Sequence, residues 1–239
     1  AALAQPNNIL AIEYLNALRL YAPELAPLPV ERVGTGYHSE EIAGEYASAT
    51  AIRKAIVDGN KDILSTMPSF VGGPMLFNQQ FLIPQDAIGE MILYAIRRMN
   101  ASDLADLPDV GEGFENVLYR AARSATTIES FFEQVKSKRY TLARCRRIAV
   151  CALLGITVDQ VHASVTSPAG SYLKVLGFQK SARPLLSEIA RRRRLPMFIR
   201  NADIDDCPLI VQRNVETDAL STDILAYAAG RDMHRDLGG

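Results

Sequence analysis

The stretch Ser48-Ala49-Thr50-Ala51-Ile52-Arg53 places two hydroxyl side chains and an arginine at the start of a predicted helix. The first N–H groups of a helix lack backbone partners and lie at the positive end of its dipole, so they favour a phosphate group. Ser48 and Thr50 can add hydroxyl donors, and Arg53 adds a planar guanidinium one turn later. The alternative interpretation is an ordinary serine N-cap followed by a solvated arginine.

The residues before this helix favour the phosphate interpretation. Pro29-Val30-Glu31-Arg32-Val33 alternates in polarity as a short strand does, and Gly34-Thr35-Gly36-Tyr37-His38 follows as a glycine-containing loop. A strand, a loop and a hydroxyl-led helix in this order form a ligand crevice in open α/β sheets. The chain contains neither GxGxxG nor GxxxxGK[ST], so neither a dinucleotide fingerprint nor a P-loop is present.

Length and composition are those of a globular protein. A chain of 239 residues allows one large domain or two modest ones, and 48% hydrophobic residues suffice for a core. Cys145, Cys151 and Cys207 form no CxxC pair, so we expect free thiols in a reducing compartment and no metal site in the protein. No apolar run approaches the ~18–20 residues of a membrane span, and we expect a soluble, cytoplasmic protein without a membrane partner.

Positive charge is concentrated in one part of the chain. Residues 136–200 contain 14 lysines and arginines but only two acidic residues, whereas the flanking segments are acidic. Phosphate backbones are the partner that best matches such a surplus, and the alternative is a solvated helix balanced by the acidic flanks. The candidate RNA-binding residues are Lys136, Lys138, Arg139, Arg144, Arg147, Arg191 and Arg192.

A helix capped by Thr141 is predicted to carry the first of two basic clusters, which comprises Lys136, Lys138, Arg139, Arg144, Arg146 and Arg147. At 100° per residue, Arg144 and Arg147 lie roughly opposite the apolar side of this helix. That apolar side comprises Leu142, Cys145, Ala149 and Ala152. We therefore expect a helix that packs on one side and carries positive charge on the other.

The remaining pattern predicts an α/β piece followed, after a break near 80–110, by a helix-rich piece. Asn8 is the predicted N-cap of a helix with Ile9, Ile12, Leu15 and Leu18 on its apolar side. Residues 102–113 are predicted to form an acidic loop. Further helices are predicted at 85–98, 114–123, 127–135 and 208–229, and strands at 171–176 and 195–199 around a helix at about 181–193.

Seven short blocks follow one another between residue 3 and about residue 200. They are Pro6-Asn7-Asn8-Ile9-Leu10-Ala11-Ile12-Glu13-Tyr14-Leu15, Arg32-Val33-Gly34-Thr35-Gly36-Tyr37-His38, Ala47-Ser48-Ala49-Thr50-Ala51-Ile52-Arg53, Gly113-Phe114-Glu115-Asn116, Lys138-Arg139-Tyr140-Thr141-Leu142-Ala143-Arg144, Leu153-Leu154-Gly155-Ile156 and Val175-Leu176-Gly177-Phe178. In this order they resemble the bacterial tRNA(Met) cytidine acetate ligases of the nucleotidyltransferase-like superfamily. Each block is loose, but seven in register are specific.

The resemblance implies a fold and an activity. It implies an α/β fold, with part of a Rossmann-like nucleotidyltransferase (HUP-type) ATP-binding domain in residues 1–80 and a helix-rich α+β tRNA-binding domain in residues 81–239. It implies that acetate and ATP form acetyl-adenylate and that the acetyl group passes to N4 of the wobble cytidine of elongator tRNA(Met). The implied ATP-binding residues are Asn7, Arg32, Ser48, Thr50 and Arg53, and the implied partners are acetate, tRNA(Met) and ATP with Mg²⁺.

One departure from the family pattern limits this expectation. The superfamily's first signature, an HxGH-type motif, is absent from a chain whose histidines are His38, His162 and His234. We therefore expect these residues to be the C-terminal part of the enzyme, unable alone to complete adenylation, and no catalytic acid or base can be assigned. The alternative function is that of a non-catalytic RNA-binding protein with a vestigial nucleotide fold.

Overall fold

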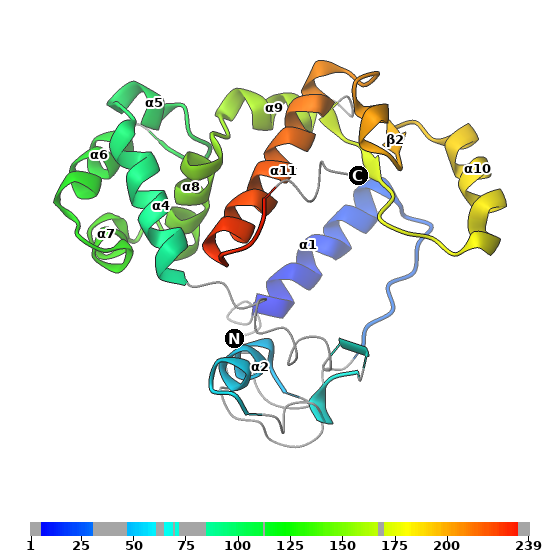
Figure 1. Cartoon of the computed structure of the whole chain (residues 1–239), viewed down its shortest axis with the longest axis horizontal. Helices are drawn as coiled ribbons and strands as arrows, with labels where there is room; N and C mark the ends of the chain where they lie inside the picture. The colour runs from blue at the N-terminus through cyan, green and yellow to red at the C-terminus, as the bar shows by residue number, and fades with distance from the viewer. Residues whose placement is uncertain are drawn as a thin grey trace. The chain divides into compact units, whose positions relative to one another are not determined.

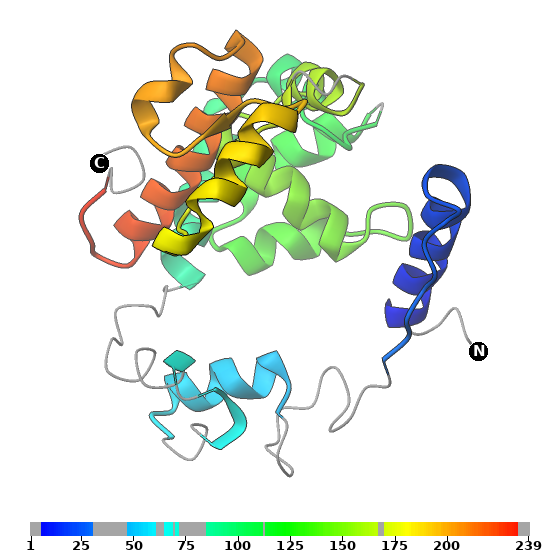
Figure 2. The same ribbon diagram turned by 90° about the vertical axis from the view of Figure 1, so that its right-hand side faces the viewer.

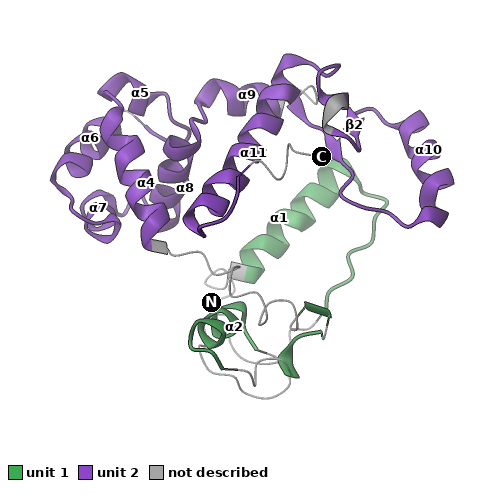
Figure 3. Ribbon diagram, in the orientation of Figure 1, with its two compact units in different colours: residues 1–78 green, residues 79–239 purple. Residues whose placement is uncertain are grey.

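The computed structural model describes residues 6–30, 47–60, 65–68, 70–71, 85–111, 113–166 and 170–233. The chain divides into two compact units, residues 1–78 and residues 79–239 (Figure 3). This division falls next to residue 80, where the sequence places the change from one domain to the next. The ligand of each domain remains a prediction.

Unit 1 contains helix α1 (Pro6–Tyr21) and helix α2 (Ala49–Val57) among its described residues (Figure 1). Helix α1 begins at Pro6, because the fixed φ of proline suits a first helical turn. The prediction that Asn8 is the N-cap is therefore wrong. The predicted apolar side of α1 is largely exposed, as at Ile9 and Leu15. Most of the predicted strand and the whole 34–38 loop lie outside the described residues.

Unit 2 is predominantly helical in its described part. The helices are α4 (Gln85–Arg98), α5 (Ala101–Ala105), α6 (Phe114–Ser124), α7 (Ile128–Val135), α8 (Leu142–Leu154), α9 (Val158–Thr166), α10 (Arg183–Arg192) and α11 (Leu209–Ala228). The helices predicted at 85–98, 114–123, 127–135 and 208–229 are confirmed to within one residue at each end. The predicted 102–113 loop instead overlaps α5, because Asn100 and Asp103 form a capping box that starts a helix.

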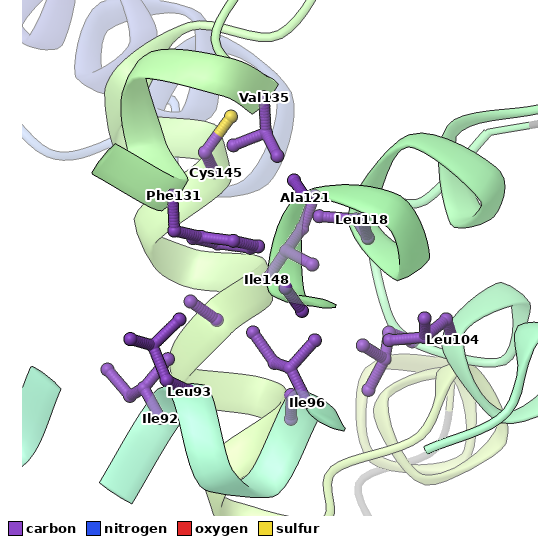
Figure 4. Close-up of a cluster of buried hydrophobic side chains, with 14 of the residues drawn as sticks. Ile92, Leu93, Ile96, Leu104, Leu118, Ala121, Phe131, Val135, Cys145 and Ile148 are labelled. Atoms are coloured by element: carbon purple, nitrogen blue, oxygen red, sulfur yellow. The ribbon is translucent and has the colours of Figure 1, made fainter. Parts of the chain in front are cut away.

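The main core of unit 2 lies among α4, α6, α7 and α8. Figure 4 shows this cluster, in which the side chain of Phe131 lies among Ile92, Leu93 and Ile148. Arg97 strengthens the packing, since its Nε donates to the carbonyl of Ala122 at 2.7 Å. Ala122 lies in the last turn of α6, so the Arg97 cation satisfies one of the last carbonyls of that helix and also complements the helix dipole.

Helix α8 combines the predicted cap with the predicted buried side. Thr141 Oγ1 accepts from the N–H of Arg144 at 3.4 Å, and Cys145, Ala149 and Ala152 are buried as expected. Leu142 is the exception, because the residue is 37% exposed. The helix ends at Gly155, whose φ of 68° is accessible to glycine without a side-chain clash.

A small β-α-β unit follows the helical core. Strands β1 (Leu173–Lys174) and β2 (Met197–Phe198) are parallel, with Leu173 opposite Met197, and the connection between them contains the 3₁₀ turn η5 (Lys180–Ala182) and α10. Phe198 anchors a second buried cluster with Ile204, Val211 and Val215, formed by β2, the 3₁₀ turn η6 (Asn201–Ile204) and α11. The two strands and the intervening helix were predicted, although the strands are shorter than expected.

Helix α11 connects this second cluster to the main core. It contacts α4, α8 and α9. Its orange-to-red ribbon lies between α8 and β2 in Figure 1, and Figure 2 shows the same ribbon after a 90° turn. Between α9 and α11, buried Gln160 donates to Asn214 Oδ1 and Thr217 Oγ1, each at 3.2 Å. Because unpaired amides are costly inside a protein, this network fixes the register of the two helices.

Candidate functional site

The start of α2 is the first candidate site. Ser48 is 3% exposed, and its Oγ accepts from the N–H of Ala51 at 3.0 Å. Ser48 is therefore the N-cap that the alternative interpretation expects, and phosphate binding at this helix start remains a prediction. The helix start that this cap fixes still has its dipole and first N–H groups directed away from the helix body, as phosphate binding requires.

Thr50 and Arg53 lie one turn apart on α2. Thr50 is half-buried and Arg53 is exposed, whereas Ala51, Ala55 and Ile56 form the buried side. Residues three apart are neighbours on a helix surface, so the hydroxyl and the guanidinium can reach one anion. In the part of the chain that is described, Arg53 forms no ion pair that would compete for its guanidinium.

The other two predicted ATP-binding residues have different outcomes. Asn7 lies in the first turn of α1 and is exposed. Arg32 lies outside the described residues. A single ATP site formed by Asn7, Arg32 and the start of α2 remains a prediction.

The second candidate site is the basic turn, residues 136–139, between α7 and α8. The turn is closed by two hydrogen bonds, from Ser137 N to the carbonyl of Tyr140 at 2.9 Å and from Tyr140 N to Ser137 Oγ at 3.1 Å. Lys136, Lys138 and Arg139 are all exposed. A closed turn therefore presents three cations to solvent, whereas the sequence analysis placed them on the helix capped by Thr141, which begins only at Leu142.

Arg144 and Arg147 have structural partners that the sequence did not reveal. Arg144 Nη2 donates to the carbonyl of Asp109 at 2.6 Å, and Arg147 Nη2 pairs with the Asp109 carboxylate at 2.9 Å. Asp109 has a φ of 68°, an uncommon conformation for a side-chain-bearing residue, and the two arginines hold it. Both arginines therefore contribute to the loop before α6, and an RNA-binding role for them remains a prediction.

Tyr140 completes this network. Its ring stacks on Phe114 at a centroid distance of 3.5 Å, and the Arg144 guanidinium lies 4.4 Å from its centroid. Its hydroxyl accepts from the N–H of Gly111 at 2.9 Å. A Cβ at Gly111 would lie 2.8 Å from that hydroxyl, so glycine is needed for the approach. The basic turn is thereby anchored to the helical core.

Arg191 and Arg192 lie in the last turn of α10. Both guanidinium groups pair with the carboxylate of Glu188, Arg191 at 2.6 Å. No residue of α10 is buried, as its position at the right-hand edge of Figure 1 illustrates. Their predicted role in RNA binding is untested, and one of the two charges is balanced within the helix.

A groove between α4, α7 and α8 is the third candidate site, and the sequence analysis did not identify it. Its volume is about 640 Å³, and apolar side chains such as Phe132 and Leu142 line it together with the charged Glu129, Glu133, Lys136 and Arg146. The lining residues recur every fourth position, as in Leu142, Arg146 and Val150. That periodicity was visible in the sequence, but whether the residues from α4, α7 and α8 line one groove depends on how these three helices pack.

Other expectations concern thiols, metals and membranes. The three cysteines are free, and burial raises the pKa of the Cys145 and Cys151 thiols, which makes them poor nucleophiles. Among the described residues there is no group of three or more His, Cys, Asp or Glu side chains placed to hold a metal ion. Within the same residues, no single helix has the length and hydropathy to cross a membrane. The helices Leu142–Leu154 and Val158–Val165 reach that length and hydropathy only when they are taken together, and they are bent by 100° relative to each other.

Comparisons with known proteins give these sites a context. Proteins named tRNA(Met) cytidine acetate ligase from Acetivibrio thermocellus and Alkaliphilus metalliredigens are each 32% identical to this chain. The alignments cover 99% and 95% of this chain but 59% and 55% of the relatives, so the chain spans little more than half of their length.

Solved structures show the same fold. The crystal structure of Thermotoga maritima TmcAL without ligand matches with a TM-score of 0.82 and 24% identity over 99% of this chain and 60% of that chain. The structure of the same protein bound with alpha-thio ATP matches with a TM-score of 0.81 and 23% identity over 99% of this chain and 59% of that chain. The predicted nucleotidyltransferase-like fold is therefore confirmed, whereas its detailed domain layout remains a prediction.

A family model described as HIGH nucleotidyl transferase matches residues 1–236. The resemblance read from seven short blocks is thus confirmed by a match over nearly the whole chain. On this evidence the chain belongs to the HIGH nucleotidyl transferase family, and its relatives in that family include the bacterial tRNA(Met) cytidine acetate ligases.

Proposed function

We propose that this chain is part of an ATP-dependent ligase that activates acetate and transfers the acetyl group to the wobble cytidine of elongator tRNA(Met). The observation that carries this proposal is the 32% identity, over 99% of the chain, to a protein named tRNA(Met) cytidine acetate ligase. The alpha-thio ATP bound by the structural neighbour from Thermotoga maritima supports ATP as the nucleotide.

The first chemical step joins acetate to AMP. An acetate oxygen attacks the α-phosphorus of ATP, the bond from that phosphorus to the bridging oxygen of the β-phosphate breaks, and pyrophosphate leaves. Negative charge accumulates on phosphate oxygens, so alignment and fixed positive donors supply most of the catalysis. ATP enters with Mg²⁺ as its counter-ion, since Mg²⁺ is usually held by phosphate oxygens.

The start of α2 provides donors suited to this step. The helix dipole, the Thr50 hydroxyl and the Arg53 guanidinium favour the β- and γ-phosphates, with Ser48 fixing the helix start as its cap. Asn7 and Arg32 complete the proposed ATP site through the family resemblance. Arg53 thus stabilises the departing pyrophosphate rather than the acetyl group.

The second step requires an exposed cytosine. The N4 amine attacks the acetyl carbonyl of the mixed anhydride, AMP leaves, and the amine gives up a proton. A stacked base is not accessible to this reaction, so the anticodon loop must present an unstacked cytidine. The basic turn and the arginines of unit 2 are suited to hold the RNA backbone during this step.

Labelled acetate tests the proposal directly. The protein, as its gene encodes it, is incubated with ATP, labelled acetate and elongator tRNA(Met). We expect acetate-dependent AMP formation and label in N4-acetylcytidine, and no label in a transcript with uridine at the wobble position. Tight tRNA binding without AMP formation would instead support the alternative, a non-catalytic RNA-binding protein with a vestigial nucleotide fold.

A further inference from the structure

The groove between α4, α7 and α8 combines features that the proposed chemistry does not use. Ile88 and Ile92 of α4, Ile128 and Phe132 of α7, and Leu142 and Val150 of α8 line it with apolar surface. Buried Gly89 allows α4 and α7 to approach, because a Cβ there would lie 2.7 Å from Ile128 Cγ2. The groove is therefore a built feature of the helix packing.

Four charged side chains line the same groove. Glu129 and Glu133 come from α7, Lys136 from the basic turn and Arg146 from α8. In the part of the chain that the structure describes, none of the four forms an ion pair, although both signs are present. Charges of opposite sign that share a cavity without pairing are available to a ligand that carries both kinds of group.

One side of the groove suits a flat ring. The Arg146 guanidinium carbon lies 5.9 Å from the centre of the Phe132 ring. Bases that leave the stack of single-stranded RNA are held on aromatic rings and arginine planes and read by hydrogen bonds on their edges. Carboxylates accept hydrogen bonds from exocyclic amino groups and repel exocyclic carbonyl groups.

We propose that this groove binds one unstacked RNA base that carries an exocyclic amino group. Phe132 and Arg146 contact the ring, Glu129 and Glu133 accept from the amino group, and Lys136 pairs with the adjoining phosphate. The inference rests on the proposed binding of tRNA and adds a base-reading site to it. The protein recognises this base by its exocyclic amino group, and all residues of the site belong to unit 2.

Two RNA hairpins test the inference. They share one stem, and their loops contain only cytidine or only uridine, so that they differ at the loop in an amino group against a carbonyl group. Fluorescence anisotropy measures the affinity of the protein for each. We expect at least about five-fold tighter binding of the cytidine hairpin, and we expect the Glu129→Gln, Glu133→Gln double variant to lose this preference while it still binds both.

Glu115→Gln is the matched control, because this carboxylate lies on α6 in the same unit and outside the groove. This control should keep the wild-type preference for the cytidine hairpin. Arg146→Ala should lower the affinity of the protein for both hairpins. Three outcomes would overturn the groove assignment and leave the proposed function intact. They are equal affinity for the two hairpins, an unchanged preference in the double variant, and a wild-type protein that binds tRNA(Met) but neither hairpin. Loss of all RNA binding by the wild type would overturn both.

Discussion

Arg53 gives the most specific test of the hypothesis that the start of α2 binds the phosphates of ATP. Its exposed guanidinium forms no ion pair within the described part of the chain and lies on the same surface of α2 as Thr50. We expect Arg53→Ala to lower acetate-dependent AMP formation by roughly 100-fold or more, as loss of a transition-state donor does. Arg53→Lys should rescue it only partly, because lysine keeps the charge but lacks the bidentate fork.

The control for this prediction is Arg19→Ala, an exposed arginine in the last turn of α1. It should leave AMP formation near the wild-type rate. If Arg53→Ala behaved like Arg19→Ala, Arg53 would be a solvated helix residue and the phosphate assignment would fail.

Residue-level roles could be predicted only where the signal is local. Thr141 was predicted as a cap, and a cap at Ser48 was the alternative to phosphate binding, because a hydroxyl at a helix start can accept from an N–H three residues later. The partners of Arg144 and Arg147 were missed, because Asp109 is 35 residues from Arg144 in the chain and belongs to another segment. A sequence does not reveal which basic side chains form ion pairs within the protein, because the acidic partner can lie far away in the chain.

At the scale of elements, the approach of α4 to α7 decides both the core and the groove. Gly89 has no room for a side chain, because Ile128 is β-branched and its Cβ would lie 3.0 Å from a Cβ at Gly89. Gly89→Ala should therefore lower the free energy of unfolding by about 1–3 kcal/mol through overpacking. Urea unfolding followed by circular dichroism measures this change.

Gly177→Ala provides the comparison, because nothing lies within 4 Å of a Cβ at that position. Its stability should stay within about 0.5 kcal/mol of the wild type. Equal stability of the two variants would mean that α4 and α7 do not approach as closely as the structure indicates.

Helix positions were predictable because caps and periodicity are local, and the helix at 85–98 was placed with its bounds correct. Contacts between helices were not predictable in this way. The apolar periodicity of α1 suggested a buried side that is exposed among the described residues, and the stripe of Leu142, Arg146 and Val150 faces a groove rather than the core. Periodicity identifies a surface of a helix but leaves open what covers it.

At the scale of the whole molecule, the proposed activities belong to different units, with ATP assigned to residues 1–80 and tRNA to residues 81–239. The sequence supported this division through charge, since the basic surplus falls entirely after residue 135. Arg144 and Arg147 are poor positions for testing it. Their substitution would also release Asp109 and disturb the loop before α6.

Lys136 and Lys138 give a cleaner test, because both are exposed in the closed turn and form no ion pair within the described residues. The Lys136→Ala, Lys138→Ala double variant should bind tRNA(Met) more weakly. Its plot of log affinity against log salt should be shallower by about 0.7–0.9 for each phosphate that the variant no longer neutralises. Acetate-dependent AMP formation without tRNA should be unchanged, because the proposed ATP site lies in the other unit.

Arg120→Ala on α6 removes an exposed cation of unit 2 away from the turn, and it should leave both the affinity and the salt slope unchanged. Filter binding over a salt series and AMP release, measured on the same preparations, give the two readouts. An unchanged salt slope in the lysine variant would exclude the turn from RNA binding. A parallel loss of AMP formation would show that the two activities are not divided between the units, because removal of two solvent-exposed charges from a closed turn leaves the fold intact.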